Sequence, residues 1–447
     1  MKIKELNKIF ETYIDNHLIP DEEERSWISD RYNELSKILE GESFQTGSCA
    51  RFTHIPPVND LDVIWVLPEE KHKELKKISP ETLNPERILS DLSMRLKEEY
   101  KNKQDVEINA QTHSVEINFQ KKNFSIDVVP AKPLEEKSEC KDKPLFEVPE
   151  ILLHSKSVRK SFYEKEKQIE WIKTDPWGYI REAEEFYKAN SSFRYCSRLL
   201  KAWKYCIYNH HYEKLSIRSF HVEEIVKEVI KEEGLPDGTF RIIRYIFENL
   251  IEEYLKSPKF KDKADSKRYI DSYVEDLTEG ELNEIKLYQN SAKILLEKIL
   301  NAENKNSVKK LIERLLSREE FIEGYGIKRH NNSEYFLKID GRFAIDTDTG
   351  KRSASLRQNN EIIKKGKEIK FGIKEKDLPK DCDLKWKVKN RGQEAKENKC
   401  LRGEISDDVT SQDPEKARYL GVHYVECYAI AGNKCIAHDR IKVKIVD

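Results

Sequence analysis

Two carboxylates stand close together at the start of a predicted strand. The sequence Asp-Leu-Asp at residues 60–62 opens an apolar run. Because side chains alternate along a strand, Asp60 and Asp62 point to one face together with Ile64 and Val66. The opposite face carries four apolar side chains: Leu61, Val63, Trp65 and Leu67. Adjacent carboxylates repel unless cations neutralise them, and oxygen ligands select Mg²⁺ or Mn²⁺. The pattern therefore predicts a divalent-cation site.

A third acid and a glycine-serine pair complete this pattern. Asp127 lies in the alternating run "FSIDVVP" (residues 124–130), which pairs with "SVEINFQ" (residues 114–120) as a predicted hairpin. Upstream, Gly47 lets the backbone approach a phosphate, and the hydroxyl and backbone N–H groups at Ser48 donate to its oxygens. Two metal ions on the three acids would hold the attacking hydroxyl and the triphosphate of an in-line displacement.

Each part has an ordinary alternative, since Asp-x-Asp often starts a solvated strand and Gly-Ser is a common turn. The order Gly-Ser, then Asp-x-Asp on a strand, then an Asp in an apolar strand resembles the minimal signature of the polymerase-β-like nucleotidyltransferase superfamily. This resemblance implies that Asp60, Asp62 and Asp127 are catalytic and hold two Mg²⁺ or Mn²⁺ ions. It also implies that Gly47 and Ser48 bind the nucleotide.

A cationic stripe lies on a predicted helix near residue 200. Its four members, spaced by four, three and three residues, are Arg194, Arg198, Lys201 and Lys204. An ordinary amphipathic helix with solvated cations would show the same spacing. The Leu-Lys-x-Trp-Lys helix and the following Ser-x-x-x-Glu segment at 219–223 look like the helical spine of the oligoadenylate-synthetase and cGAS/DncV-like enzymes. In that family the matching residues contact the donor triphosphate, which assigns nucleotide binding to Lys201, Lys204 and Ser219.

Two later segments extend the resemblance over nearly the whole chain. Residues 266–300 are similar to the late helices of bacterial CD-NTases, the second-messenger oligonucleotide or dinucleotide synthetases. The carboxy-terminal third resembles the adenylyl/guanylyl cyclase and synthetase-associated sensor domain. Its matching residues are Trp386, Val388, Asn390, Gly392, Ala395, Arg402 and Gly403. Asp271 matches a family acid only loosely and is left out of the site, whereas Arg51 and Thr53 suit a structural role or ligand contact equally well.

The secondary-structure elements that must position these residues include both helices and strands. Helical spacing marks the first 40 residues and the segment 177–323, and short alternating strands follow. Residues 130–170 are rich in Pro, Lys and Glu and predict a long surface connection. We expect an α+β fold: a polymerase-β-like nucleotidyltransferase palm with a helical bundle, followed by a small all-β, sandwich-like domain. The predicted domains are 1–170 (palm with amino-terminal helices), 171–325 (helical, completing the nucleotide cleft) and 330–447 (sensor).

The composition restricts which ligands, which cellular compartment and which cysteine roles we expect. The 447 residues hold 81 Lys+Arg and 82 Asp+Glu, a net charge of -1, which argues against strong constitutive nucleic-acid binding. No run is long and apolar enough for a signal peptide or a membrane span, so we expect a cytoplasmic protein without membrane association. The eight cysteines form no Cys-x-x-Cys pair, and those near His423 and His438 lack zinc spacing. We expect them to pack as small apolar side chains.

The resemblance implies an enzyme that condenses nucleoside triphosphates, ATP, GTP or a pyrimidine nucleotide, into a cyclic di- or trinucleotide. The implied setting is bacterial anti-phage signalling, in which the product activates a downstream effector encoded elsewhere. The carboxy-terminal domain would be a ligand sensor or a scaffold. Alternatives are transfer of nucleotides to an RNA or protein acceptor, synthesis of linear oligonucleotides, or a nucleotide-binding sensor that has lost catalysis. Retention of all three acids argues against the last.

Overall fold

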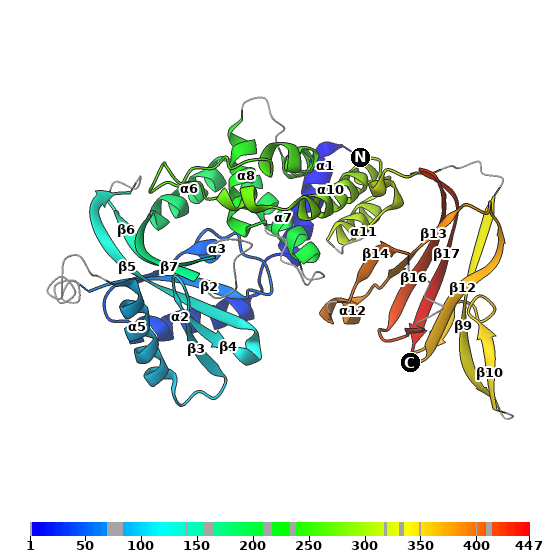
Figure 1. Ribbon diagram of the computed structural model, residues 1–447, viewed down its shortest axis with the longest axis horizontal. Coiled ribbons are helices and arrows are strands. Elements are labelled where there is room, and N and C mark those ends of the chain that lie inside the picture. The colour runs from blue at the N-terminus through cyan, green and yellow to red at the C-terminus, as the bar shows by residue number, and fades with distance from the viewer. Residues whose placement is uncertain are drawn as a thin grey trace.

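The computed structural model describes an α+β protein, which confirms the predicted fold class. The residues it describes are 2–68, 84–138, 142–155, 165–208, 217–232, 238–316, 320–329, 335–347, 350–398, 400–407 and 414–447. Figure 1 shows a group of helices between a twisted sheet on the left and two further sheets on the right.

The first sheet, called the palm, holds seven strands. They are β1 (Ser43–Gln45), β2 (Asp60–Val66), β3 (Val106–Ala110), β4 (Val115–Phe119), β5 (Phe124–Lys137), β6 (Pro144–Ser155) and β7 (Lys165–Thr174). Their order is β1-β2-β5-β4-β3, and β6 and β7 continue from the far part of β5. Strands β2 and β5 are parallel, whereas the other pairings in this sheet are antiparallel. Strand β5 follows β3 and β4 in the chain, yet it lies beside the strand that carries Asp60 and Asp62.

The two faces of the palm have different coverings. The apolar side chains of β2 that alternate with the acids, Leu61, Val63 and Trp65, pack with α2 (Glu22–Ile38) and α5 (Pro85–Tyr100). The other face carries the acids and, farther along, a small cluster that includes Ile64 and Val66. The predicted alternation along β2 is therefore confirmed, and the acidic ends of the strands face away from the main palm core.

The prediction of a surface connection over residues 130–170 is wrong. Strand β5 continues to Lys137, and β6 and β7 pair with each other from Phe146 with Thr174 to Ser155 with Lys165. The alternation of apolar and polar residues is hard to recognise in this segment, because it holds four prolines and many Lys and Glu residues. Proline is depleted in strands, and exposed strands carry charged side chains on both faces. The hairpin extends the palm beneath the start of the helical layer.

The helical layer is built from α6 (Pro176–Ala189), α7 (Ser192–Tyr208), α8 (Ser219–Lys231), α9 (Thr239–Asn249), α10 (Glu279–Leu300) and α11 (Lys305–Leu315). The amino-terminal helix α1 (Ile3–His17), which the sequence grouped with the palm, packs here through Leu6, Phe10 and Ile14. Thus the first and the middle parts of the chain share one core. Among the helices of the described residues, none combines the length and the apolar character that crossing a membrane requires.

The carboxy-terminal part is β-rich, as predicted. Its strands are β8 (Lys328–Arg329), β9 (Phe336–Thr347), β10 (Gly350–Ser355), β11 (Ile362–Lys364), β12 (Glu368–Asp377), β13 (Asp383–Lys389), β14 (Arg402–Ser406), β15 (Glu415–Lys416), β16 (Gly421–Ala431) and β17 (Lys434–Val446), with the short helix α12 (Gln393–Glu397). They form two sheets, β10-β9-β12-β15 and β11-β17-β16-β13-β14 with β8. One apolar core, with Trp386 and Phe371 among its members, lies between the sheets.

Glu320 joins the helical layer to these sheets. Its carboxylate accepts hydrogen bonds from the hydroxyl of Tyr288 on α10 at 3.3 Å and from the backbone N–H of Ile405 on β14 at 2.7 Å. Its carbonyl accepts a hydrogen bond from the ammonium of Lys387 on β13 at 3.2 Å. Lys387 also pairs with the buried Glu426. The polar contacts between the helical layer and the sheets therefore lie in the protein interior.

Candidate nucleotidyl-transfer site

The three acids lie on one face of two neighbouring parallel strands. In the register of β2 and β5, Asp62 pairs with Asp127 and Asp60 pairs with Ser125. Side chains at paired positions project to the same face of a sheet, so Asp62 and Asp127 are side by side and Asp60 is one pleat away. Strand alternation predicted the shared face of Asp60 and Asp62, whereas the place of Asp127 beside them was implied by the family resemblance.

These acids carry negative charge that the protein does not fully offset. Burial, and then the charges of Asp60 and Asp127, raise the pKa of Asp62 to about 6. Burial also raises the pKa of Asp127, although the hydroxyl of Ser114 donates a hydrogen bond to it at 3.1 Å. Within the described residues, no three His, Cys, Asp or Glu side chains are close enough as they lie to hold a metal ion. The all-oxygen donor set and its mutual repulsion nevertheless fit a hard divalent cation.

The Gly47-Ser48 turn leans against Asp62. Gly47 begins α3 (Gly47–Ala50) with φ +65°, in the left-handed region, and a Cβ there would lie 1.7 Å from a carboxylate oxygen of Asp62. The backbone N–H of Thr46 donates a hydrogen bond to the carbonyl of Asp62 at 2.9 Å. The predicted phosphate-binding turn and the predicted metal ligands are therefore in direct contact, and only glycine leaves room for that contact.

Lys204 and Ser219, predicted to bind the triphosphate, lie together. The ammonium of Lys204 on α7 donates a hydrogen bond of 2.6 Å to the hydroxyl of Ser219, the first residue of α8. Burial, and then the charge of Lys201, lower the pKa of Lys204 to about 8, while the charge of Asp60 acts in the opposite direction. The pair thus forms a cationic contact within electrostatic reach of Asp60.

Lys204 is expected to make donor binding pH-dependent. The cation is lost as the pH rises through about 8, so the KM for ATP should rise roughly tenfold between pH 7 and pH 9 if the protonated form alone binds the donor. Arginine keeps its charge over this range. Steady-state kinetics at pH 7, 8 and 9 should therefore give a nearly flat KM profile for Lys204→Arg. A profile with the same slope in both proteins would show that Lys204 does not bind the donor through its charge.

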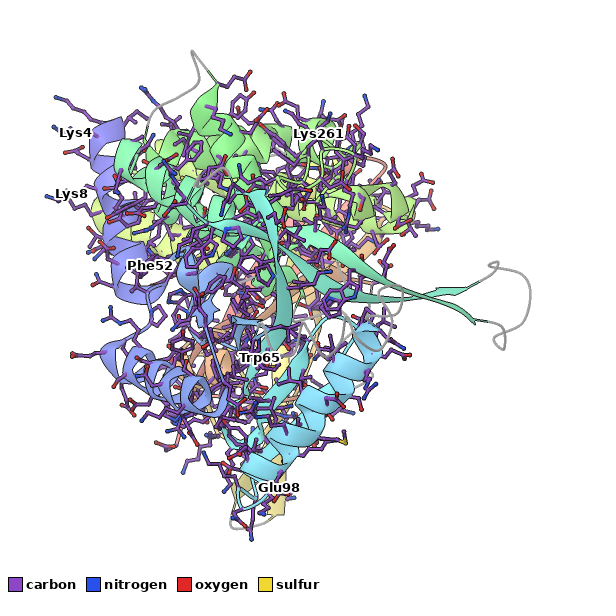
Figure 2. The ribbon with its side chains drawn as sticks, turned by 90° about the vertical axis from the view of Figure 1, so that its left-hand side faces the viewer. Lys4, Lys8, Phe52, Trp65, Glu98 and Lys261 are labelled. Carbon is purple, nitrogen blue, oxygen red and sulfur yellow. The ribbon has the colours of Figure 1, made fainter. Side chains whose placement is uncertain are left out.

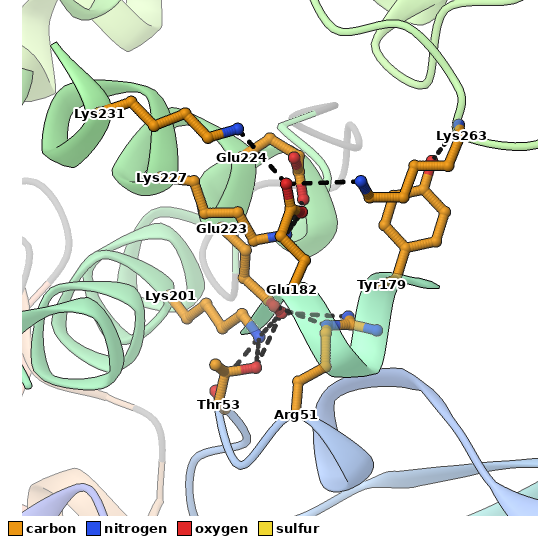
Figure 3. A network of polar contacts seen from close by, with 10 residues as sticks. All are labelled: Arg51, Thr53, Tyr179, Glu182, Lys201, Glu223, Glu224, Lys227, Lys231 and Lys263. Atoms are coloured by element: carbon orange, nitrogen blue, oxygen red, sulfur yellow. Dashed lines mark hydrogen bonds and ion pairs between the residues drawn. The ribbon is translucent and has the colours of Figure 1, made fainter. Parts of the chain in front are cut away.

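Lys201, the third residue predicted to bind the triphosphate, has a different surrounding. It is 2% exposed, and its ammonium donates hydrogen bonds to the carbonyl and the hydroxyl of Thr53, at 3.1 and 2.9 Å, and to Glu223 at 2.6 Å. Glu223 also pairs with Arg51 at 2.7 Å. Figure 3 shows this cluster between the palm loop and the helices. The structure therefore separates Lys201 from the Lys204–Ser219 pair.

The other two stripe cations also contact the palm loop. The guanidinium of Arg198 donates hydrogen bonds to the carbonyls of Phe52 at 2.8 Å and His54 at 3.4 Å. Arg194 stacks over the rings of Phe52 and Tyr187, at 4.7 and 3.8 Å from their centroids. In Figure 2 the loop that carries Phe52 lies below the amino-terminal helix that Lys4 and Lys8 mark. Most of the stripe therefore faces the palm rather than solvent.

No role for Glu223 was predicted from the sequence, where this residue served only as the last position of the Ser-x-x-x-Glu spacing. A signal was present, since a carboxylate among the apolar residues of α8 needs a cation when it is buried. Asp271, left out of the site, is fully buried and accepts the backbone N–H groups of Lys259 and Phe260 at 2.8 and 3.1 Å. It also lies 3.6 Å from the His221 ring, so it braces the 259–271 loop against α8.

Comparison with known proteins agrees with this architecture. Residues 4–143 match the family model of the Second Messenger Oligonucleotide or Dinucleotide Synthetase domain. Residues 316–446 match that of the Adenylyl/Guanylyl and SMODS C-terminal sensor domain. A search of curated proteins gives no match.

Among solved structures, CdnC of E. coli MS115-1 in its HORMA-deltaN complex is 14% identical, with a TM-score of 0.51 over 70% of this chain and 96% of that chain. DncV cyclic AMP-GMP synthase of Vibrio cholerae is 14% identical, with a TM-score of 0.45 over 62% and 69%. The CdnC match shows that the covered 70% of this chain shares the fold of that structure. The amino-terminal part of the chain thus carries a second-messenger oligonucleotide or dinucleotide synthetase domain and the carboxy-terminal part carries the associated sensor domain, which is the domain combination of a CD-NTase with a sensor.

Proposed function

We propose that this enzyme condenses nucleoside triphosphates into a cyclic di- or trinucleotide. The observation that supports this most is the meeting of three predicted groups: Asp62 beside Asp127, the Gly47 turn against Asp62, and the Lys204–Ser219 pair within the field of Asp60. Such an arrangement gives one face for the acceptor hydroxyl and one for the donor triphosphate.

In the proposed reaction each side chain has a separate task. Asp60, Asp62 and Asp127 would hold two Mg²⁺ or Mn²⁺ ions, which supply charge neutralisation at the attacking and leaving oxygens. Asp127 would also accept the proton of the acceptor ribose hydroxyl, whose oxygen attacks the α-phosphorus of the donor. Ser48, Lys204 and Ser219 would orient the triphosphate and stabilise the charge that develops as the bond to the β-phosphate breaks and pyrophosphate leaves.

The proposed substrates are ATP, GTP or a pyrimidine triphosphate. A second round of the same transfer, with the intermediate turned over in the site, would close the ring. We further propose a cytoplasmic role in bacterial anti-phage signalling, in which the product activates a separate effector and the sensor domain regulates synthesis. The sequence resemblance and the sensor-domain match support this setting.

Product analysis tests the proposal. Purified protein would be incubated with Mg²⁺ or Mn²⁺ and the four labelled triphosphates, treated with phosphatase and analysed by mass spectrometry, with Asp60→Ala/Asp62→Ala as the control. We expect a phosphatase-resistant cyclic species that the control lacks. Linear products alone, or label transferred to an added RNA or protein acceptor, would contradict cyclic synthesis.

A further inference from the structure

A buried ionic cluster joins the palm loop to the helical layer. Glu223 of α8 accepts hydrogen bonds from the Arg51 guanidinium at 2.7 and 3.2 Å, from the Thr53 hydroxyl at 2.8 Å and from Lys201 at 2.6 Å. All four residues are 7% exposed or less. Figure 3 shows Arg51 and Thr53 reaching up from the loop and Lys201 and Glu223 reaching down from the helices.

The cluster is saturated rather than open to a ligand. A carboxylate has about four acceptor sites, and Glu223 receives four hydrogen bonds. The three protons of the Lys201 ammonium are likewise matched by three acceptors, two on Thr53 and one on Glu223. Removing one partner of such a buried set leaves an uncompensated charge, which costs far more than the loss of a surface ion pair.

The same contacts fix the backbone that follows the glycine-serine turn. Three successive carbonyls of the loop accept hydrogen bonds from α7: Phe52 and His54 from Arg198, and Thr53 from Lys201. Phe52 has φ +57°, a conformation that a non-glycine residue keeps only when its surroundings enforce it. At the start of the loop, the carbonyl of Ser48 accepts the Thr53 N–H at 3.0 Å, so holding Thr53 also holds Ser48.

We propose that Glu223 is a positioning residue for the donor-phosphate turn. Through its contacts with Arg51, Thr53 and Lys201, it holds the Gly47–Thr53 loop in one conformation. In that conformation Ser48 is available to the donor phosphates and Gly47 leaves room for Asp62. Lys201 acts with Glu223 in this role, while Lys204 and Ser219 carry the contact with the triphosphate. This inference rests on the proposed nucleotidyl transfer and adds the residues that couple the helical layer to the donor pocket.

The test compares Glu223→Gln with Glu224→Gln in the full-length protein. Glu224 is the next residue of α8, is also largely buried and binds Lys227 at 2.7 Å, but makes none of the contacts to the palm loop described above. We expect Glu223→Gln to speed amide hydrogen exchange in residues 47–54 at least tenfold and to raise the KM for ATP at least tenfold, with a smaller change in kcat, because the neutral amide leaves the buried charges of Arg51 and Lys201 uncompensated. Glu224→Gln should leave both quantities near wild type.

A lower unfolding temperature for Glu223→Gln with unchanged loop exchange and unchanged KM would overturn the proposal, because the cluster would then be structural alone. If Glu223→Gln does not fold, Thr53→Val keeps both ion pairs and removes only the hydroxyl contacts, and the same two readouts apply to it. Hydrogen exchange needs no turnover, so it tests the cluster even if wild-type protein makes no cyclic product, which is the result that contradicts the proposed function.

Discussion

Replacing Asp60 with asparagine is expected to lower product formation by roughly 10³-fold at saturating Mg²⁺. Asp60 is exposed at the start of β2, one pleat from the Asp62–Asp127 pair. The amide keeps the shape of the side chain but removes a negative charge, and neutral amides bind hard cations more weakly than carboxylates do. The initial rate of pyrophosphate release from labelled triphosphates measures the loss, and the thermal midpoint should stay close to wild type because the side chain is exposed.

Asp91→Asn is the matched control for this substitution. Asp91 is an exposed residue of α5 whose carboxylate lies 3.9 Å from Arg87, on the helix that covers the opposite face of the palm. Its replacement makes the same chemical change away from the acidic face and should leave the rate unchanged. A rate in Asp60→Asn within a few-fold of the control would remove Asp60 from the catalytic set.

The second large effect is expected from Gly47→Ala, which should reduce activity about 100-fold or more, because displacement of a reacting group by about 1 Å costs that much. The added Cβ would lie 1.7 Å from an oxygen of Asp62, so the carboxylate or the turn must move. The positive φ of Gly47 adds strain for any side chain. Activity measured at several Mg²⁺ concentrations checks this, and a displaced Asp62 should also raise the Mg²⁺ concentration needed for half-maximal rate.

Gly280→Ala provides the comparison for the glycine substitution. Gly280 lies in the first turn of α10, where the nearest atom to an added Cβ is the Thr278 hydroxyl at 3.9 Å. Alanine is a better helix former than glycine, so this variant should be at least as stable as wild type and fully active. Full activity of Gly47→Ala would mean that the turn and Asp62 are not packed as the structure has them.

The palm site follows closely from the sequence because its geometry is local. The alternation along β2 puts Asp60 and Asp62 on one face, and the hairpin from Ser114 onward gives Asp127 the same kind of strand position. What the pattern does not contain is the register between two parallel strands separated by a crossover. That register, which places Asp62 beside Asp127, came to the prediction through family resemblance and not through periodicity.

Long-range polar contacts could not be predicted in this way. The spacing of the stripe puts Lys201 and Lys204 on one helix face, yet one bonds Thr53 and the other Ser219. Which of two neighbouring cations is enclosed depends on what packs against each turn of the helix, and residue types on one helix do not encode that. The strands after residue 130 were missed for a related reason. Their charged and proline-rich composition is typical of exposed chain, and composition does not encode the pairing with a neighbouring strand that makes them strands.

The separation of Arg51 from Glu223 by 172 residues sets an order of events during synthesis of the chain. At about 5 to 20 residues per second, a ribosome needs roughly 10 to 30 s to make that segment. During this interval the glycine-serine turn, both acids of β2 and then Asp127 are already made, but the helix that holds the loop is not. A nascent or prematurely terminated chain that ends before α8 therefore contains every predicted metal ligand and still lacks Glu223, the carboxylate that pairs with Arg51 and Lys201, so we expect messenger synthesis to begin only after about half of the protein has been translated.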